Sequence, residues 1–191
     1  AHIDWLLTDS RSLCFPETTL FFALSTKRND GSKYIPDLYA RGVRNFVVSK
    51  LPENKDEYPD SNFLVVSNPL KALQKLAELH RQKFQVPVIG ITGSNGKTIV
   101  KEWLHQLLSP ERTIVRSPRS YNSQIGVPIS VWQMNESTEL GIFEAGISEV
   151  GEMRALQNII RPTIGVLTNI GGAHQENFFS LQEKCMEKLL L

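Results

Sequence analysis

The sequence predicts an α/β protein: a small N-terminal α/β substrate domain, followed by part of a P-loop-type parallel-sheet ATPase domain. Three observations carry this prediction. Short β-branched and aromatic runs alternate with amphipathic segments along the chain. A glycine-rich stretch, residues 90–98, stands between an apolar run and a helical pattern, which is the setting of a phosphate loop. Polar residues also follow several later apolar runs, where parallel strands would carry their carboxyl ends.

The composition is that of an ordinary globular protein. The chain has 191 residues, is 41% hydrophobic and 21% charged, and its formal charge of +1 comes from mixed signs. No basic patch suggests a nucleic-acid partner. No apolar run approaches the ~20 residues that span a bilayer, and no signal peptide is visible, so we expect a cytoplasmic location without membrane insertion. Cys14 and Cys185 lack metal-ligand or redox spacing, which favours reduced thiols.

The first part of the chain predicts a small α/β unit. A short helix is expected over Ile35–Arg41, stopping at Gly42. Runs rich in β-branched and aromatic residues predict strands at Trp5–Thr8, Leu20–Leu24, Asn45–Val48 and Phe63–Val66.

A longer helix is expected after Asn68, a natural N-cap that is followed by Pro69 at the first helical position. Its apolar residues repeat at helical spacing and indicate a buried stripe rather than a site. They are Leu73, Leu76, Ala77 and Phe84. The following segment, residues 85–87, is the expected domain joint, which divides the chain into domains 1–85 and 86–191.

After the joint the pattern becomes strand–helix–strand, which predicts a parallel sheet with helices on both faces. The helix that starts at Lys97 is expected to place Val100, Trp103, Leu104 and Leu107 on one face. Two more helices are expected, from about Pro128 and from about Gly151 to Ile160. The expected strands are Val88–Thr92, Thr113–Arg116, Leu140–Glu144 and Thr163–Thr168.

The phosphate loop is the strongest functional signal. Its glycines allow a tight turn with N–H groups directed at phosphate oxygens, and the next helix adds its N-terminal dipole. Lys97 is expected to reach the terminal phosphates of ATP or GTP, and Thr98 to offer its hydroxyl to Mg²⁺. Ile91 stands where the general motif has glycine, so this is the shorter G-x-x-G-K-T form; the structural alternative is a glycine-rich turn with an incidental lysine. The expected nucleotide-binding residues are Gly93, Ser94, Asn95, Gly96, Lys97 and Thr98.

Four further residues are candidates for the chemistry of the site. Glu144 ends an apolar strand, as acids that serve Mg²⁺ in phosphate-loop folds do, although a strand-end acid is also an ordinary solvated group or helix cap. His174, in a loop after another strand, is a possible metal or phosphate ligand or a merely exposed side chain. Asn122 precedes a helix start, where it is either a polar site group or part of the turn. Lys188 is by default a solvated helix lysine.

Five ordered segments resemble the Mur ligases, the ATP-dependent amide-forming enzymes of peptidoglycan precursor synthesis. Residues 90–98 resemble their ATP loop, and residues 122–128 an Asn-containing loop that ends in Ile-Gly-Val-Pro. The other matching segments are Asp9-Ser10-Arg11 with residues 20–24, Phe143–Gly146, and residues 169–174 followed by Glu176 and Phe178. Ala173 before His174 is most similar to the members that add D-alanyl-D-alanine to UDP-N-acetylmuramoyl-tripeptide.

The resemblance implies a role for each matching residue. Lys97 and Thr98 would meet ATP phosphate and Mg²⁺, with Glu144 and His174 as metal ligands. Asn122 would lie near the junction of substrate and phosphate. The family also carries a carbamylated lysine on the helix after its His segment, and Lys188 matches that position, so Lys97, His174 and Lys188 are the catalytic candidates. The residues expected to contact the uridine end of the substrate are Asp9, Ser10 and Arg11.

The resemblance also implies that the chain is an N-terminal part of a three-domain enzyme and is inactive by itself. Lys188 is then expected to be an unmodified, poorly ordered lysine near a frayed end. Some members are fused to an alanine racemase, and these residues neither indicate nor exclude such a fusion. Gln124 and Ser148-Glu149 depart from common family residues, which affects fine substrate contacts. The alternatives are another Mur ligase, a folylpolyglutamate synthetase-like ligase, against which residues 1–85 argue, or a non-catalytic nucleotide or UDP-sugar binding module.

Overall fold

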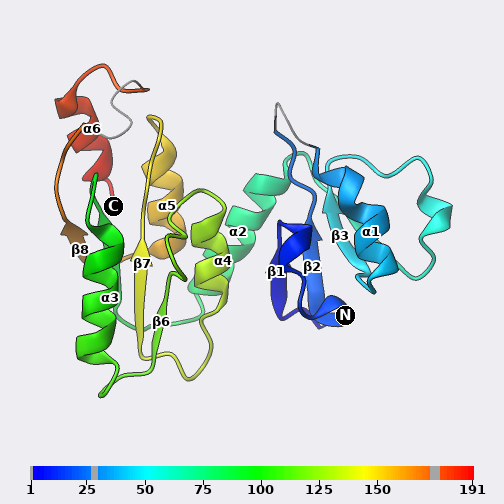
Figure 1. The fold of residues 1–191 in the computed structure, drawn as a ribbon, viewed down its shortest axis with the longest axis horizontal. Coiled ribbons are helices and arrows are strands. Elements are labelled where there is room, and N and C mark those ends of the chain that lie inside the picture. Colours follow the sequence, from blue (N-terminus) through cyan, green and yellow to red (C-terminus); the bar gives the residue numbers. More distant parts are fainter. Residues whose placement is uncertain (1, 27–29, 173–176) are drawn as a thin grey trace. The chain divides into compact units, whose positions relative to one another are not determined.

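A computed structural model describes residues 2–26, 30–172 and 177–191 (Figure 1). The chain divides into two compact units, residues 1–73 and 74–191, and the division falls within helix α2 (Pro69–Arg81). Within the described ranges, none of the helices has the length and apolar character that crossing a bilayer requires.

The N-terminal unit is built on a parallel four-stranded sheet in the order β1-β2-β3-β4. Helix α1 (Ile35–Ala40) covers one face, and its Ile35 and Leu38 are buried in a core with aromatic residues from the strands. Phe21, Phe46 and Phe63 stand side by side in register on three neighbouring strands. The strands are β1 (Trp5–Leu7), β2 (Thr19–Phe22), β3 (Asn45–Val48) and β4 (Asn62–Val65), with 3₁₀ turns at Ser10–Ser12, Pro16–Thr18, Gly31–Tyr34 and Lys55–Glu57.

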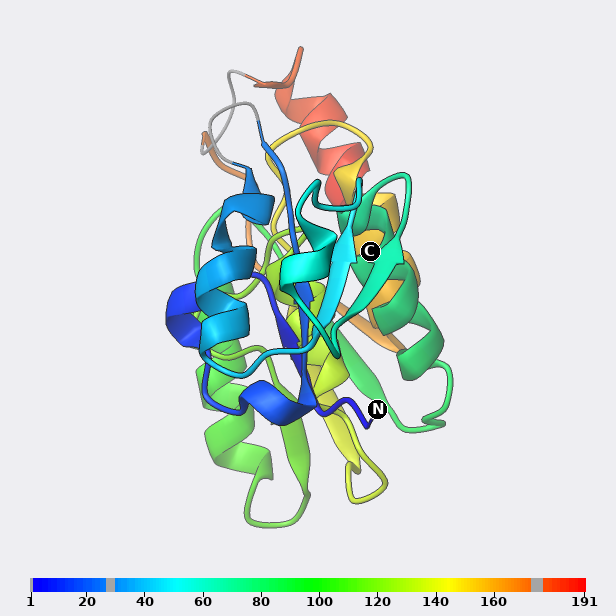
Figure 2. The ribbon, with the colours of Figure 1, turned by 90° about the vertical axis from the view of Figure 1, so that its right-hand side faces the viewer.

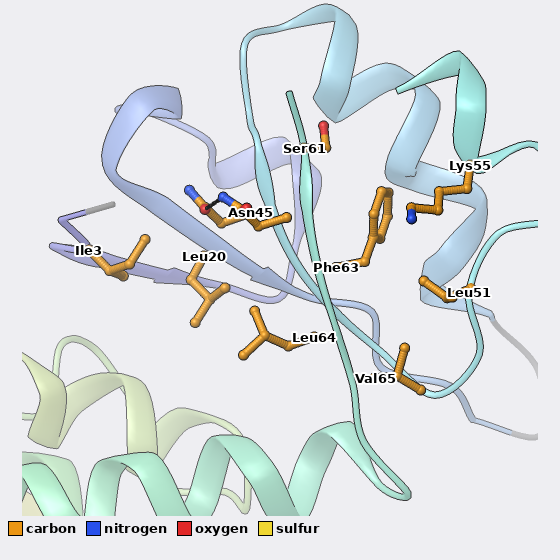
Figure 3. Close-up of a pocket in the computed structure, with 10 residues that line it drawn as sticks. Ile3, Leu20, Asn45, Leu51, Lys55, Ser61, Phe63, Leu64 and Val65 are labelled. Carbon is orange, nitrogen blue, oxygen red and sulfur yellow. Dashed lines mark hydrogen bonds between the residues drawn. The ribbon is translucent and has the colours of Figure 1, made fainter. Parts of the chain in front are cut away.

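A shallow pocket of about 720 Å³ lies on the same unit (Figure 3). Asn45 and Asn62, neighbours across β3 and β4, hydrogen bond to each other beside it. The lining is mostly apolar and comes chiefly from Ile3, Leu20, Leu51, Phe63, Leu64 and Val65. The described lining does not include Asp9, Ser10 or Arg11, so this pocket is separate from the predicted uridine-binding segment.

The second unit contains another parallel sheet, in the order β6-β7-β5-β8, which confirms the predicted sheet type. The strand that leads into the phosphate loop is central, between β7 and β8. Because all four strands are parallel, their carboxyl ends meet at one edge of the sheet. The strands are β5 (Val88–Thr92), β6 (Ile114–Arg116), β7 (Leu140–Glu144) and β8 (Ile164–Leu167).

Helices cover both faces of this sheet, as the sequence predicts (Figure 1). Helix α3 (Lys97–Leu108) packs Val100, Leu104 and Leu108 on one face, while α4 (Gly126–Trp132) and α5 (Glu152–Ile160) form a core with the other. Side chains alternate along a strand, so β7 turns Leu140, Ile142 and Glu144 to the α3 side. This alternation places the Glu144 carboxylate beside α3.

Three local expectations are wrong. Trp103 and Leu107 are exposed rather than packed with Val100 and Leu104, because they lie on the outer side of α3. Helix α4 begins at Gly126 instead of Pro128, since proline is tolerated within the first helical turn and does not have to open it. Helix α2 ends at Arg81, so Phe84, expected on its apolar stripe, lies beyond the helix, although it still packs against the core. The remaining predicted helices and strands agree with the structure to within one or two residues at their ends.

Candidate nucleotide and metal site

The phosphate loop joins the carboxyl end of β5 to the start of α3. Gly93 has a φ of 141°, and a Cβ atom there would lie 1.9 Å from Oγ1 of Thr168. Only glycine avoids this clash and adopts the backbone conformation without strain. The close approach of the segments that follow β5 and β8 therefore requires glycine at position 93.

The loop is fastened to the segment that follows β8. The backbone N–H groups of Ser94 and Asn95 donate to the main-chain oxygen and the side-chain oxygen of Asn169, each at 2.9 Å. The Thr168 hydroxyl donates to the Asn95 carbonyl at 2.6 Å. Gly171 N–H donates to Oγ of Ser94 at 2.8 Å. Hydrogen bonds with residues 168–171, which are far from the loop in the sequence, therefore fix the shape of the phosphate loop independently of a ligand.

Lys97 lies at the first turn of α3 and is half-buried. Its Nζ donates to the Gly93 carbonyl at 2.8 Å, so the side chain folds back over the loop. Burial lowers the pKa of Lys97, and the charge of nearby Glu144 opposes that shift. The first backbone N–H groups of a helix lack intrahelical acceptors. The loop therefore offers a cation together with the N-terminal amides of α3 to an anion such as a phosphate.

Thr98 and Glu144 meet at this edge of the sheet. Oγ1 of Thr98 donates to Oε2 of the fully buried Glu144 at 3.1 Å, although the residues are 46 positions apart. Nδ2 of Asn122 lies 3.4 Å from the same oxygen, and Oγ of Ser120 lies 3.3 Å from Oγ1 of Thr98. The convergence expected from the strand ends is found for these side chains.

Glycine is also required at position 146, next to Asn122. The N–H of Gly146 donates to the Asn122 carbonyl at 2.7 Å. A Cβ atom on Gly146 would come within 2.8 Å of the Asn122 side-chain oxygen. The segment after β7 therefore holds Asn122 against Glu144 through close backbone contact.

The residues present fit a hard divalent cation such as Mg²⁺. Oε1 of Glu144 is buried and has no hydrogen-bond partner of good geometry, although the Lys101 ammonium lies 3.0 Å away as an ion pair. Carboxylate and hydroxyl oxygens are the ligands that Mg²⁺ prefers. Within the described residues, no group of three or more His, Cys, Asp or Glu side chains forms a metal cluster. His174, the third expected ligand, lies outside the described residues.

Lys188 is buried in the structure, so the expectation of a poorly ordered lysine near a frayed end is wrong. The residue is 3% exposed, and its Nζ lies 3.3 Å from the Gly93 carbonyl, beside the phosphate loop. Burial, followed by the charges of Lys97 and Lys184, lowers the pKa of Lys188 to about 8. A lysine with a lowered pKa carries more of the neutral amine, which is the reactive form.

Helix α6 (Leu181–Lys188) lies at the carboxyl-end edge of the sheet (Figures 1 and 2). Polar contacts hold it there. The carboxylate of Glu187 accepts N–H bonds from Gly151 at 2.9 Å and Met153 at 3.1 Å, at the N-terminus of α5. Nζ of Lys184 donates to the Gly171 carbonyl at 2.6 Å. These anchors explain why Lys188 is ordered next to Gly93.

The predicted uridine-binding segment lies in the N-terminal unit, just after β1. Asp9 caps a short 3₁₀ turn by accepting from the Arg11 backbone, and its carboxylate also pairs with the Arg11 guanidinium at 2.7 Å. The hydrogen bonds from Arg11 lower the pKa of Asp9. The Ser10 carbonyl accepts from Arg41 at 2.8 Å, which ties the turn to the end of α1. The Arg11 side chain itself is largely exposed.

Sequence reasoning missed the buried cations and acids around the loop. Lys101, one helical turn after Lys97, is fully buried beside Glu144. Lys184 and Glu187 anchor α6, and Ser120 lies next to Thr98. The spacing of Lys97 and Lys101 is a signal that both face the same side of α3, but lysines on a helix are ordinarily solvated.

Comparison with known proteins identifies the second unit. Residues 91–191 match the Mur ligase middle domain. The chain is 38% identical over 175 residues to UDP-N-acetylmuramoyl-tripeptide--D-alanyl-D-alanine ligase of Borreliella burgdorferi, covering 89% of this chain and 38% of that protein. It is 33% identical over 187 residues to the Bacillus subtilis ligase of the same name, covering 98% of this chain and 40% of that protein.

Solved structures agree along almost the whole chain. A crystal structure of MurF from Acinetobacter baumannii superposes with a TM-score of 0.88 at 28% identity, covering 98% of this chain and 40% of that one. The MurF ligase from Thermotoga maritima in complex with ADP gives a TM-score of 0.84 at 28% identity, covering 97% and 42%. The chain thus spans about two fifths of the length of the relatives that it matches.

Proposed function

The chain belongs to the Mur ligase family. From that premise we propose that it forms part of a MurF-type ligase. The reaction is the ATP-dependent joining of D-alanyl-D-alanine to UDP-N-acetylmuramoyl-tripeptide. The observation that carries the proposal is the Thr98–Glu144 contact beside a phosphate loop. It occurs in a chain that aligns over most of its own length with UDP-N-acetylmuramoyl-tripeptide--D-alanyl-D-alanine ligases. The proposed enzyme works in the cytoplasm, without nucleic acid and without insertion into a membrane.

The chemistry proceeds through an acyl phosphate. A carboxylate oxygen of the tripeptide attacks the γ-phosphorus of ATP, and the bond to the β–γ bridging oxygen breaks to release ADP. The amine of D-alanyl-D-alanine then attacks the acyl carbon, loses a proton, and phosphate leaves from the tetrahedral intermediate. Both steps move negative charge, so positioning and charge neutralisation contribute most of the catalysis.

Residues of the phosphate loop bind and orient the ATP phosphates. Lys97, with the N-terminal amides of α3, neutralises the terminal phosphates, once its ammonium turns from the Gly93 carbonyl toward the nucleotide. Glycines 93 and 96 together with Ser94 and Asn95 shape the loop around them. Asn122, at hydrogen-bonding distance from Glu144, lies where the substrate carboxylate would approach.

Thr98, Glu144 and His174 would hold Mg²⁺, which neutralises phosphate charge when bound. Lys188 is proposed to act as a carbamate in the complete enzyme, which would turn a buried cation into an anion beside the loop. Burial near the like charges of Lys97 and Lys184 favours that change.

The two proposed domains are residues 1–85, which would bind the UDP end of the substrate, and residues 86–191, which form an incomplete ATP-binding domain. Asp9, Ser10 and Arg11 are the proposed uridine contacts. Their turn presents the exposed Arg11 guanidinium and the Asp9 carboxylate paired with it, whereas Ser10 is buried. The adenine contacts and the site for D-alanyl-D-alanine are proposed to lie outside this chain.

The decisive experiment is a ligase assay on the protein that carries this chain at its natural length. We expect phosphate release that requires ATP, UDP-N-acetylmuramoyl-tripeptide and D-alanyl-D-alanine together, with the pentapeptide product detected by mass spectrometry. A related ligase would accept a different amino substrate, and a folylpolyglutamate synthetase-like enzyme would accept glutamate. Binding of nucleotide or UDP-sugar without turnover by the complete protein would contradict the ligase proposal.

A further inference from the structure

Lys101 is a fully buried lysine for which the proposed reaction, on which this inference rests, provides no role. Its side chain is 0% exposed, although an ammonium group is costly to remove from water. It sits one turn after Lys97 on α3, on the side that faces the sheet. A buried charge of this kind persists only where other groups compensate it.

The Lys101 ammonium reaches groups from separate parts of the second unit. It lies 3.0 Å from Oε1 of Glu144 on β7 and 3.2 Å from Glu102. It donates to the carbonyl of Ser117 at 2.8 Å and also to the carbonyl of Arg119. One side chain thus connects α3, β7 and the loop after β6.

That loop, residues 117–122, carries two side chains of the candidate site. Ser120 lies next to Thr98, and Asn122 lies next to Glu144. Arg119, whose carbonyl is one of the two that accept from Lys101, has a φ of 50°. This left-handed conformation is unfavourable for a residue other than glycine. Strained backbone of this kind persists when surrounding contacts hold it. The ammonium supplies such a contact at the Arg119 carbonyl.

Glu144 is held on both sides by this arrangement. Lys101 faces Oε1, while Thr98 and Asn122 approach Oε2. Rotation of the carboxylate would separate Oε1 from the ammonium in a fully buried setting, where an unpaired charge is costly. The pair therefore directs Oε2 to the phosphate-loop side.

We propose that Lys101 is a positioning residue of the nucleotide–metal site, which orients Glu144 and holds the loop 117–122 so that both can serve a divalent cation bound with nucleotide. Its role is distinct from that of Lys97, which faces the phosphates. Groups that orient metal ligands affect metal affinity by about 10- to 100-fold when they are removed.

A purely structural role is the alternative, and Arg81 provides the matched control. Arg81 is also a buried cation, 5% exposed, and it donates to four backbone carbonyls near the ends of α2 and α5. None of these four acceptors belongs to the phosphate loop, β7 or the loop 117–122. Arg81→Met should therefore lower stability without changing how the site responds to a cation.

The test measures ADP binding to the protein that carries this chain at its natural length by isothermal titration calorimetry, once with EDTA and once with Mg²⁺. In the wild type and Arg81→Met, Mg²⁺ should strengthen ADP binding. In Lys101→Met this gain should fall by about tenfold or more, while ADP affinity in EDTA changes less than about twofold, as expected if phosphate-loop contacts remain. Glu144→Gln should lose the same gain, and the double variant should lose no more than either single variant.

Lys101→Gln is the second variant if Lys101→Met fails to fold, because its amide is polar but carries no charge to pair with Glu144. The wild type gives a measurement that needs no variant. The ¹⁵N signal of the Lys101 ammonium should shift when Mg²⁺ and ADP are added together and stay in place with ADP and EDTA.

A full Mg²⁺ gain in a folded Lys101 variant, or an unchanged ammonium signal, would overturn the positioning role. A wild type that binds ADP with no Mg²⁺ gain would instead contradict the metal site of the proposed function. The two failures are therefore distinguishable.

Discussion

Lys97 and Lys188 donate to the same acceptor, the carbonyl oxygen of Gly93, at 2.8 and 3.3 Å. One lysine opens α3 and the other closes α6, 91 positions later (188 − 97). The ammonium groups of half-buried Lys97 and buried Lys188 repel each other around this carbonyl, which adds to the effect of burial in lowering the pKa of Lys188. An anion in the loop, or loss of charge on Lys188, would relieve that repulsion.

Lys97→Ala should remove most nucleotide affinity and leave the fold intact. A hydrogen bond to a charged group contributes about 1.5–3 kcal/mol, so ATP or ADP affinity should fall roughly 10- to 100-fold. Isothermal titration calorimetry measures the change, and circular dichroism checks the fold. Lys83→Ala, an exposed lysine beyond α2, is the control and should bind normally. Equal affinity in a folded Lys97→Ala variant would refute the phosphate-loop assignment.

Gly93→Ala should destabilise the second unit and abolish nucleotide binding. The added methyl would meet the Thr168 hydroxyl oxygen at 1.9 Å and force a φ of 141° on alanine. We expect a loss of at least about 2 kcal/mol in the free energy of unfolding, measured by urea denaturation. Gly165→Ala on β8 has open space around its Cβ position and serves as the control. Similar stability losses in both variants would show that the contact with Thr168 is unimportant.

Lys188 should make stability rise with pH over a defined window. Its pKa is about 8 in the folded chain and 10.5 as a model value, so between these values the folded state binds fewer protons than the unfolded state. Stability then rises with pH across the window, by up to about 3 kcal/mol in total, and is insensitive to this group below pH 8. Urea denaturation of wild type and Lys188→Met, in bicarbonate-free buffer, should show a larger rise in the wild type than in the variant, where only Lys97 still contributes one. Parallel pH profiles for the two proteins would contradict this.

Lys188→Ala should inactivate the complete ligase, and short carboxylic acids should partly restore its activity. The reason is that a free carboxylate replaces the anion that a carbamylated Lys188 would supply. Phosphate release in the presence of acetate or formate is the measurement, and chloride at equal ionic strength is the control. Full activity of the alanine variant without added acid would exclude the carbamate role.

Glu187→Ala should loosen helix α6. The substitution leaves the N–H groups of Gly151 and Met153 without their carboxylate acceptor, and such buried donors cost about 1–3 kcal/mol. Hydrogen exchange should then quicken across α6 and at the start of α5. Glu183→Ala removes a carboxylate that accepts the Phe179 N–H at 2.8 Å, and its effect should be smaller. Equal exchange rates in the two variants would argue against the anchoring role of Glu187.

Much of the fold follows from local pattern. Apolar runs predicted the strands of both sheets and the parallel order of the second one, and the Asn68-Pro69 pair predicted the start of α2. The loop between β5 and α3 was readable because glycine, lysine and threonine must occupy fixed positions around a phosphate. Trp103 was misplaced because helical spacing does not say which side of a helix has a partner.

The sequence by itself determined the strand and helix order, the phosphate loop and the expectation that Thr98 and Glu144 lie at one sheet edge. Only the tertiary structure decided which charges are buried there. Lys101 and Lys188 look like ordinary helix lysines in the sequence, yet both are enclosed. Lys101 is covered by β7 and the loop 117–122, and Lys188 lies against Gly93 of the phosphate loop. Burial and ion pairing depend on segments far apart in the chain, and no local periodicity encodes them.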